Sequence, residues 1–321
     1  MNIMTSNGRI DLYALDYPAL EAMLAEWGAS REVAREVWRW LYLNVSGTAL
    51  VRRPAANEEG TRASVRRPST NDERVGISAA NEGEIFEQMT TVPQEVRERL
   101  AAEMYLCVPQ LLARQEAPGG ATWKHLLALA DGEQVEVVVL RYGGRDSARY
   151  SACISTQVGC ACGCRFCATG QMGFVRQLSV GEIIGQVLHV QRELLVHGAQ
   201  LSNFVLMGMG EPLLNYDNVM EAVRRLSDPR GMALPQRRIT LSTVGIVPGI
   251  LRLAEEDLYV KLALSLHAAT DEVRDALMPI NQRYPLDQLF DALRVYTTQT
   301  QRRVMLEWVM IAEVNDSLAQ A

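Results

Sequence analysis

Five of the six cysteines in this 321-residue chain lie within seventeen consecutive positions, in the stretch SACISTQVGCACGCRFC from Ser151 to Cys167. The sixth, Cys107, stands alone in the apolar setting MYLCVPQLL, which favours a core position. Cysteines separated by one or two residues rarely bridge each other without strain. In a reducing compartment such a cluster more commonly binds metal or carries out redox chemistry. The local fold must therefore bring several sulfur atoms to one point.

Three of these cysteines, Cys160, Cys164 and Cys167, follow the spacing C-x3-C-x2-C. A short loop with this spacing can place three thiolates around one metal centre, and closely spaced thiolates are the usual ligands of iron–sulfur clusters. Three ligands leave one iron free. The alternative is a zinc site, which normally takes four ligands, usually as two separated pairs. Cys162 offers a fourth sulfur, but four ligands so close in sequence would strain a tetrahedral shell.

The composition indicates a globular protein of enzyme size. Apolar residues make up 48% of the chain, enough for the core of one large α/β domain with a smaller appendage. No apolar run reaches the roughly 18 residues of a membrane span, and the first residues lack the pattern of a secretory signal. We therefore expect a cytoplasmic protein that has no membrane partner.

The charge pattern neither requires nor excludes nucleic acid. A net charge of −6 argues against a surface coated in positive charge, although a local basic surface is compatible with it. Only two of the 32 basic residues, Lys124 and Lys261, are lysines. Codon usage that favours arginine is the simpler explanation, and arginine also suits contacts with phosphate and stacked bases.

The first 150 residues divide into three predicted parts. Residues 1–45 form a helical accessory domain, because apolar side chains at helical spacing on both sides of Gly28 predict a hairpin of two helices. Residues 46–85 form a flexible insertion that is poor in large apolar side chains and repeats the motif VRRP. Residues 86–150 contain a helix from Pro93 to about Leu106 and a strand over 135–142.

The region 151–321 alternates strands with helices and forms the predicted core domain. Five apolar stretches predict strands: YSACIST, LSNFVLMG, RRITLST, VKLALSLH and RRVMLEWVMI. Helices are expected at 215–227, 247–256, 285–298 and after Ser179, which forms a possible capping box with Glu182. This alternation predicts a parallel sheet or barrel, in which functional groups gather at the carboxyl ends of the strands. Here those ends carry the cysteine loop and the motifs GMGEP, STVG and SLHA.

The spacing C-x3-C-x2-C at the end of the first core strand, with Phe166 beside the last cysteine, resembles the radical S-adenosylmethionine (SAM) superfamily. This resemblance implies a partial (βα)6 TIM-type barrel and a [4Fe-4S] cluster. The fourth iron of the cluster would bind the amino and carboxylate groups of SAM and reduce it to a 5′-deoxyadenosyl radical. More narrowly, CISTQVGC, CRFCATGQMGFVRQLSVGEI, GMGEPLLNYDNV, RRITLSTVGIVPGI, LALSLHAATDEVRDALMPIN and EWVMIAEVNDS resemble the RlmN/Cfr family of RNA methyltransferases.

The resemblance assigns roles to individual residues. Cys160, Cys164 and Cys167 would ligate the cluster. Gly210 and Glu211 would hold the methionine end of SAM, and the residues expected near its carboxylate and ribose are Ser242, Ser265, Leu266 and His267. Taken singly, these residues have ordinary readings, since GEP is a common turn and a lone histidine is more often packed than ligand-binding. Their place at successive strand ends favours a site.

Two further residues receive catalytic roles from the resemblance alone. Glu136 would be the general base that deprotonates the methylated adenine intermediate, whereas its pattern by itself indicates the polar face of a half-exposed strand. Cys153 would be a redox-active cysteine that forms a disulfide with a second cysteine near the C-terminus, whereas the simpler reading is a buried structural cysteine. Cys162 has no assigned role.

The implied activity is methylation of carbon 2 of an adenine in 23S rRNA, at the peptidyl transferase centre, and of the adenine beside the tRNA anticodon. Methylation of carbon 8 of the rRNA adenine, as by Cfr, is an alternative, and a non-enzymatic zinc or redox-sensing protein is another. An electron donor such as a flavodoxin and its reductase is implied, and we expect a monomer.

The sequence departs from the family pattern at its end, EVNDSLAQA. The family pattern continues through a further strand and helix, an asparagine-containing segment that contacts SAM, and a cysteine that carries the methyl group. We therefore expect a C-terminally truncated chain whose barrel lacks its last strand. The preferred explanation is a fragment or frameshifted gene product of an ordinary family member, and the alternative is a shortened protein with altered activity. An inactive fragment therefore stands as an alternative to the enzymatic function.

Overall fold

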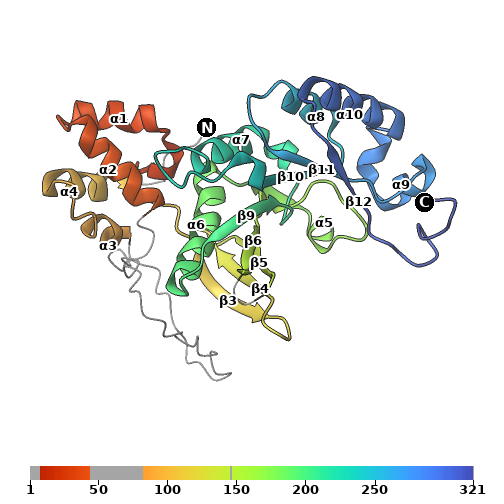
Figure 1. The fold of residues 1–321 in the computed structure, drawn as a ribbon, viewed down its shortest axis with the longest axis horizontal. Coiled ribbons are helices and arrows are strands. Elements are labelled where there is room, and N and C mark those ends of the chain that lie inside the picture. The colour runs from red at the N-terminus through yellow and green to blue at the C-terminus, as the bar shows by residue number, and fades with distance from the viewer. Residues whose placement is uncertain (1–7, 44–81, 145–146, 321) are drawn as a thin grey trace, which may run out of the picture.

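The computed structural model describes residues 8–43, 82–144 and 147–320 (Figure 1). Its largest element is a mixed sheet of eight strands in the order β12-β11-β10-β9-β6-β5-β4-β3. The strands are β3 Gln110–Glu116, β4 Thr122–Ala128, β5 Gln134–Tyr142, β6 Arg149–Cys153, β9 Leu201–Leu206, β10 Ile239–Thr243, β11 Lys261–Ser265 and β12 Val304–Glu307. Neighbouring strands run parallel from β6 to β12 and antiparallel from β3 to β6.

The parallel half of the sheet consists of the five strands predicted for the core. The central strands β10 and β11 are buried along most of their length, as expected where helices cover a parallel sheet. The predicted α/β class is therefore confirmed. Within the described residues the sheet is open, with β3 and β12 at its edges. Strand β3 escaped prediction because its sequence QLLARQE is largely exposed and does not alternate.

The helices of the core carry the apolar side chains that close the interior. They are α6 Val180–Val196, α7 Tyr216–Leu226, α8 Val247–Ala254 and α10 Leu286–Thr300. Their buried side chains join those of the strands in one hydrophobic core. Helix α6 begins at the predicted capping box, because Ser179 Oγ accepts a hydrogen bond from the Glu182 amide and Glu182 accepts one from the Ser179 amide. No helix among the described residues is long and apolar enough to cross a membrane.

The N-terminal part contains the predicted helical hairpin, α1 Tyr17–Glu26 and α2 Arg31–Tyr42, which Figure 1 shows at one end of the molecule. The short β1 Ile10–Asp11 pairs with β2 Met104–Tyr105. This pairing ends helix α4 Gln94–Glu103, so the predicted helix end at about Leu106 was wrong. Most of the predicted insertion 46–85 lies outside the described residues. Its predicted end at residue 85 was wrong, because helix α3 Glu82–Glu87 begins at Glu82.

The register of the sheet places several predicted site residues on one face. Cross-strand partners share a face of a sheet, and so do residues two apart on one strand. The pairs that carry the argument are Val138 with Cys153, Cys153 with Val205, Val205 with Thr240, Ser242 with Ala263, and Ser265 with Glu307. Glu136, Cys153, Ser242 and Ser265 therefore share one face, which we call the inner face. The opposite face is buried at Val137, Phe204 and Leu241.

Candidate active site

The cysteine loop is held by a small hairpin next to the parallel strands. Strands β7 Gln157–Gly159 and β8 Phe174–Gln177 pair, and the loop between them continues into helix α5 Ala168–Met172. The Cys160 amide donates to the Gly173 carbonyl, 2.8 Å away, and the Arg165 amide donates to the Leu277 carbonyl at 2.9 Å. These contacts fix the loop at both ends of the run of cysteines.

Four cysteines gather around one apolar contact. Cys162 and Cys164 are buried against Leu277 and Met278, and Cys160 and Cys167 pack against the same group. All of these thiols are free. The Cys162 thiol donates a hydrogen bond that lowers the pKa of Cys160 to about 7, and the same bond raises the pKa of Cys162. Burial raises the pKa of Cys164 to about 12. The three cysteines predicted to hold a cluster thus gather around one apolar group, with Cys164 buried and Cys160 and Cys167 half-buried.

Glu211 is the only carboxylate that enters this region from the GMGEP loop, and it is 2% exposed. Its Oε2 accepts a hydrogen bond from the Val244 amide at 2.9 Å, and its Oε1 accepts one from the Leu213 amide at 3.1 Å. Burial nevertheless raises the pKa of Glu211 to about 7. Burial disfavours the charged form of this carboxyl group, so the group gains a proton easily. A cationic group of a ligand beside Glu211 would instead favour the charged form.

The GMGEP loop takes its shape from the cysteine-bearing hairpin. Buried Gln157 accepts the Glu211 amide hydrogen at 2.8 Å and donates to Gln177 at 2.9 Å. Gly210 has φ +98°, and a Cβ there would lie 2.5 Å from the Gln157 Cβ. Only glycine permits this close approach, which brings Glu211 toward the cysteines.

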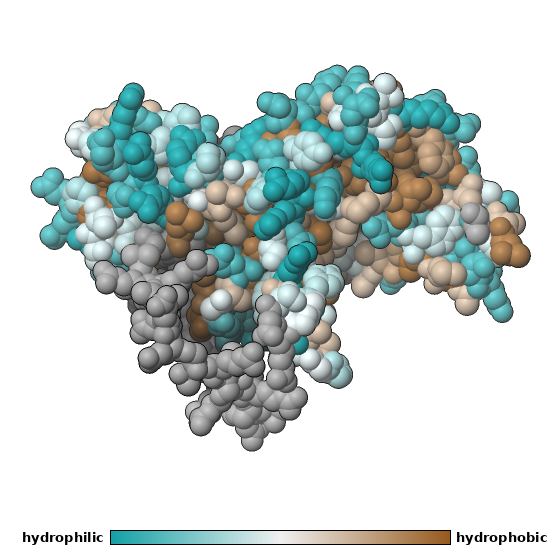
Figure 2. Space-filling view, viewed as in Figure 1, coloured by the Kyte–Doolittle hydropathy of each residue, from teal (hydrophilic) through white to brown (hydrophobic). Residues whose placement is uncertain are grey.

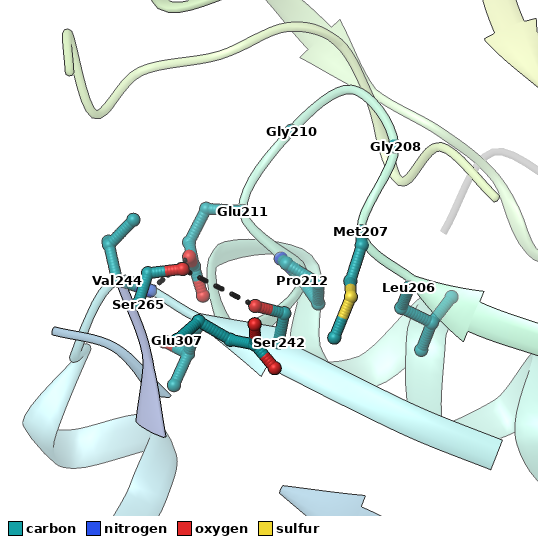
Figure 3. Close-up of a pocket in the computed structure, with 11 residues that line it drawn as sticks. Leu206, Met207, Gly208, Gly210, Glu211, Pro212, Ser242, Val244, Ser265 and Glu307 are labelled. Carbon is teal, nitrogen blue, oxygen red and sulfur yellow. Dashed lines mark hydrogen bonds between the residues drawn. The ribbon is translucent and has the colours of Figure 1, made fainter. Parts of the chain in front are cut away.

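A pocket of about 260 Å³ lies beside Glu211 at the carboxyl ends of the parallel strands (Figure 3). Its lining residues are Leu206, Met207, Gly208, Gly210, Glu211, Pro212, Ser242, Thr243, Val244, Ser265 and Glu307. Ser242 Oγ and Ser265 Oγ lie 3.5 Å apart on neighbouring strands. Figure 3 marks this contact between the two serine hydroxyl groups with a dashed line. The residues that line the pocket therefore include two with carboxyl groups, Glu211 and Glu307, three with hydroxyl groups, and several apolar ones.

His267 and Leu266 lie just outside the lining of this pocket. His267 adopts φ +57°, its Nδ1 accepts the Val309 amide hydrogen at 3.0 Å, and its ring meets Phe166 edge to face. Burial lowers the pKa of His267 to about 4, so the ring is neutral at physiological pH. Leu266 is 7% exposed, and its amide donates to the Glu307 carbonyl. Both residues connect the end of β11 to neighbouring segments.

Glu136 and Cys153 lie on the inner face, apart from the pocket lining. Glu136 Oε1 forms an ion pair with Lys124 Nζ at 2.7 Å, and both side chains are 42% exposed. The buried Ser155 hydroxyl donates to the Glu136 carbonyl at 2.7 Å and accepts the Met209 amide hydrogen at 2.9 Å. Ser155 thus links the strand of Glu136 to the GMGEP loop. Burial raises the pKa of Cys153 to about 11.

A second group of possible metal ligands lies on the covered side of the sheet, at His125, His189 and Glu193. His189 Nε2 is 3.1 Å from His125 Nδ1, and His125 Nε2 is 3.2 Å from Glu193 Oε2. Burial lowers the pKa of His125 to about 3 and that of His189 to about 4. The two nitrogens of His125 thus face two different neighbours, and Arg114 already pairs with Glu193 at 3.0 Å. This arrangement is a buried polar chain within the core.

The structure brings together four of the six residues predicted to bind SAM, namely Gly210, Glu211, Ser242 and Ser265, in one pocket. Sequence reasoning missed Met207 and Glu307, which also line it. Both stand at the carboxyl ends of strands, so the strand-end rule that identified the serines could have found them. It also missed Gln157 and the buried Arg274, whose contacts with the ends of neighbouring strands follow no helical or strand period.

Comparisons with known proteins bear on this geometry. Residues 154–320 match the family model described as the radical SAM superfamily. A dual-specificity RNA methyltransferase RlmN 1 of Myxococcus xanthus is 43% identical over 320 residues, covering 99% of this chain and 77% of the relative. A probable dual-specificity RNA methyltransferase RlmN of Moorella thermoacetica is 43% identical over 311 residues, covering 96% and 77%.

Two further comparisons extend this picture. A probable RlmN 2 of Opitutus terrae is 48% identical over 270 residues, covering 74% of this chain and 62% of the relative. The crystal structure of a radical SAM methyltransferase from Sphaerobacter thermophilus superposes with a TM-score of 0.80 at 38% identity, covering 97% of this chain and 79% of that one.

Proposed function

Because this chain belongs to the radical SAM superfamily and, within it, to the family of RlmN RNA methyltransferases, we propose that it methylates carbon 2 of adenine in 23S rRNA and tRNA. The family uses SAM and a [4Fe-4S] cluster. The observation that carries the proposal is the meeting of three free thiols and a buried carboxyl group at Val244. This residue packs against the cysteine group, and its amide donates to Glu211.

Cys160, Cys164 and Cys167 would hold the cluster. Their donor set fits, since three free sulfur atoms lie in one loop and Cys160 is easily deprotonated at neutral pH. The bound cluster would supply the electron that splits SAM into methionine and a 5′-deoxyadenosyl radical. The apolar contact of Leu277 and Met278 with the loop would exclude water from one side of this centre.

The pocket beside Glu211 would hold SAM. The Glu211 carboxylate would pair with the ammonium group of the methionine part, because such a pair is strong in a site that excludes water. The hydroxyl groups of Ser242 and Ser265 would bind the carboxylate or ribose. Leu266 and His267 would act by holding the end of β11 against the segment around Val309.

Glu136 and Cys153 would act on the adenine. Both are half-exposed on the inner face, which continues from the pocket across the sheet. A carboxylate oxygen of Glu136 would accept the proton from the methylated carbon, which restores the aromatic ring. Cys153 is proposed as the redox-active thiol. We also propose that the protein acts as a cytoplasmic monomer with a flavodoxin-type electron donor.

Mass spectrometry of 23S rRNA and tRNA tests this function directly. The chain is expressed in a bacterial host that lacks its own carbon-2 methyltransferase, and adenine nucleosides are analysed from both RNAs. We expect 2-methyladenosine, and expect it to be lost with Glu211→Ala. A methyl group at carbon 8 would assign the Cfr-type reaction instead, and unmodified adenine in both RNAs would contradict the proposal.

A further inference from the structure

Arg274 is a charged side chain that has no role in the function proposed above. It lies on α9 Asp271–Leu277 and is 0% exposed. Its guanidinium donates to four oxygens: Leu266 O at 3.1 Å, Asn281 Oδ1 at 2.7 Å, Val244 O at 2.6 Å and Ser265 O at 3.3 Å. None of these acceptors is a carboxylate. Within the described residues, Arg274 forms no ion pair.

An enclosed guanidinium without a paired anion is unusual, because desolvating a charge is costly unless another charge compensates it. Burial lowers the pKa of Arg274 to about 10, so the group stays protonated at neutral pH. The nearest acids are held one step away, since Asn281 donates to Asp271 at 2.8 Å and to Asp275 at 2.7 Å. Neither carboxylate is hydrogen-bonded to Arg274, although the charges of both act on the guanidinium and oppose the effect of burial on its pKa.

Arg274 is also joined to residues that pack against the cysteine loop. The Arg274 carbonyl accepts the amide hydrogen of Met278, which is buried against Cys162 and Cys164. Val244 connects the same elements, because its carbonyl accepts a hydrogen bond from Arg274 and its side chain packs against the group formed by Cys162, Cys164, Leu277 and Met278. Arg274 is therefore the buried cation of the proposed cluster site.

We propose that Arg274 is a positioning residue whose buried charge sets the reduction potential of the cluster held by Cys160, Cys164 and Cys167. This inference rests on the proposed function. Reduction adds one electron from a low-potential donor and breaks no bond, so the centre gains one negative charge. A fixed cation favours the reduced state, and it does so strongly where water cannot screen it. The same hydrogen bonds hold the ends of β10 and β11 together, which orients the pocket.

The test is redox titration of the reconstituted protein without SAM, followed by electron paramagnetic resonance of the reduced cluster. Arg274→Gln removes the charge, Arg274→Lys keeps it, and Arg165→Gln removes an exposed charge from the cysteine loop as a matched control. We expect Arg274→Gln to lower the ratio of reduced to oxidised cluster at least tenfold at a fixed potential, about 59 mV for one electron. Arg274→Lys and Arg165→Gln should shift this ratio much less.

An unchanged ratio in folded, fully loaded Arg274→Gln would overturn the inference, as would equal shifts in Arg274→Lys and Arg274→Gln. If Arg274→Gln does not fold or load iron, Asn281→Asp carries the test, because it places a carboxylate on the guanidinium without removing the arginine. It should also lower the ratio, and an unchanged ratio there would overturn the inference. If the wild-type chain takes up no four-iron cluster, the proposed function itself fails, which is a separate outcome.

Discussion

Glu211 holds its carboxyl group in a buried position, where it accepts hydrogen bonds from the Leu213 and Val244 amides and from the Thr243 side chain. These donors are not enough to offset burial, and the pKa of the group rises to about 7. An arriving ammonium group would supply the missing positive charge. A positive charge beside Glu211 would therefore lower its pKa, which makes the titration of Glu211 a sensitive report on the site.

The pH dependence of stability should show the raised pKa of Glu211. The unfolded chain releases the Glu211 proton near the ordinary value of 4.5, whereas the folded protein holds it up to about pH 7. The folded state thus binds more protons between these values, so stability falls as the pH rises through this window, by about 3 kcal/mol in total. Urea unfolding of the metal-free protein at about pH 5 and about pH 8 measures this loss. Glu211→Gln should lose less, and an equal slope in both proteins would contradict the account.

Gly210 makes a second prediction at the residue scale. Gly210→Ala should destabilise the protein by about 2 kcal/mol or more and abolish SAM binding, because the new Cβ would meet Gln157 and the positive φ is unfavourable. Gly198→Ala is the matched control, since Gly198 has φ +68° with nothing within 4 Å of a new Cβ. It should cost about 1 kcal/mol and leave SAM binding intact. Calorimetric titration with SAM would show whether the two variants differ; similar affinity in both would contradict the close approach.

At the scale of elements, sequence patterns predicted the helices and strands that depend on local interactions. Apolar runs identified every strand of the parallel half, and the capping box identified the start of α6. Helix α9 was missed because DEVRDAL is short and mostly charged, which is typical of a solvated surface. Its arginine is instead buried by contacts with β10 and β11. Such pairings between distant segments leave no periodic signal, so neither Arg274 nor the role of Gln157 could be predicted.

The start of α6 also anchors the cysteine hairpin. Glu182 of the capping box accepts two hydrogen bonds from Arg176 on β8, at 2.8 and 2.9 Å. Ser179→Ala should therefore lower the free energy of unfolding by about 1 kcal/mol. Ser179→Thr keeps the hydroxyl group and should recover most of this loss. Urea unfolding of the two variants measures this free energy. If both variants unfold with the same free energy as the wild type, the cap does not stabilise the protein.

At the scale of the whole molecule, the sheet organises the site through its register. Five parallel strands bring the GMGEP loop, Ser242 and Ser265 to one end, while β5 and β6 carry Glu136 and Cys153 on the same face. The α/β class and the strand-end location of the site were predictable, because they follow from alternating strands and helices. The sequence could not predict that Glu136 and Cys153 share a face of the sheet with Ser242 and Ser265. This depends on how the strands pair in the folded sheet.

The central claim is that three particular cysteines hold one iron–sulfur cluster. Anaerobic reconstitution with iron and sulfide, followed by iron analysis and electron paramagnetic resonance after reduction, tests it most directly. The account predicts about four irons per chain in the wild type and in Cys162→Ala and Cys107→Ala, with loss of the cluster in Cys160→Ala, Cys164→Ala and Cys167→Ala. Bound zinc without cluster absorbance, or a cluster that survives all three of these changes and is lost with Cys162→Ala, would contradict it.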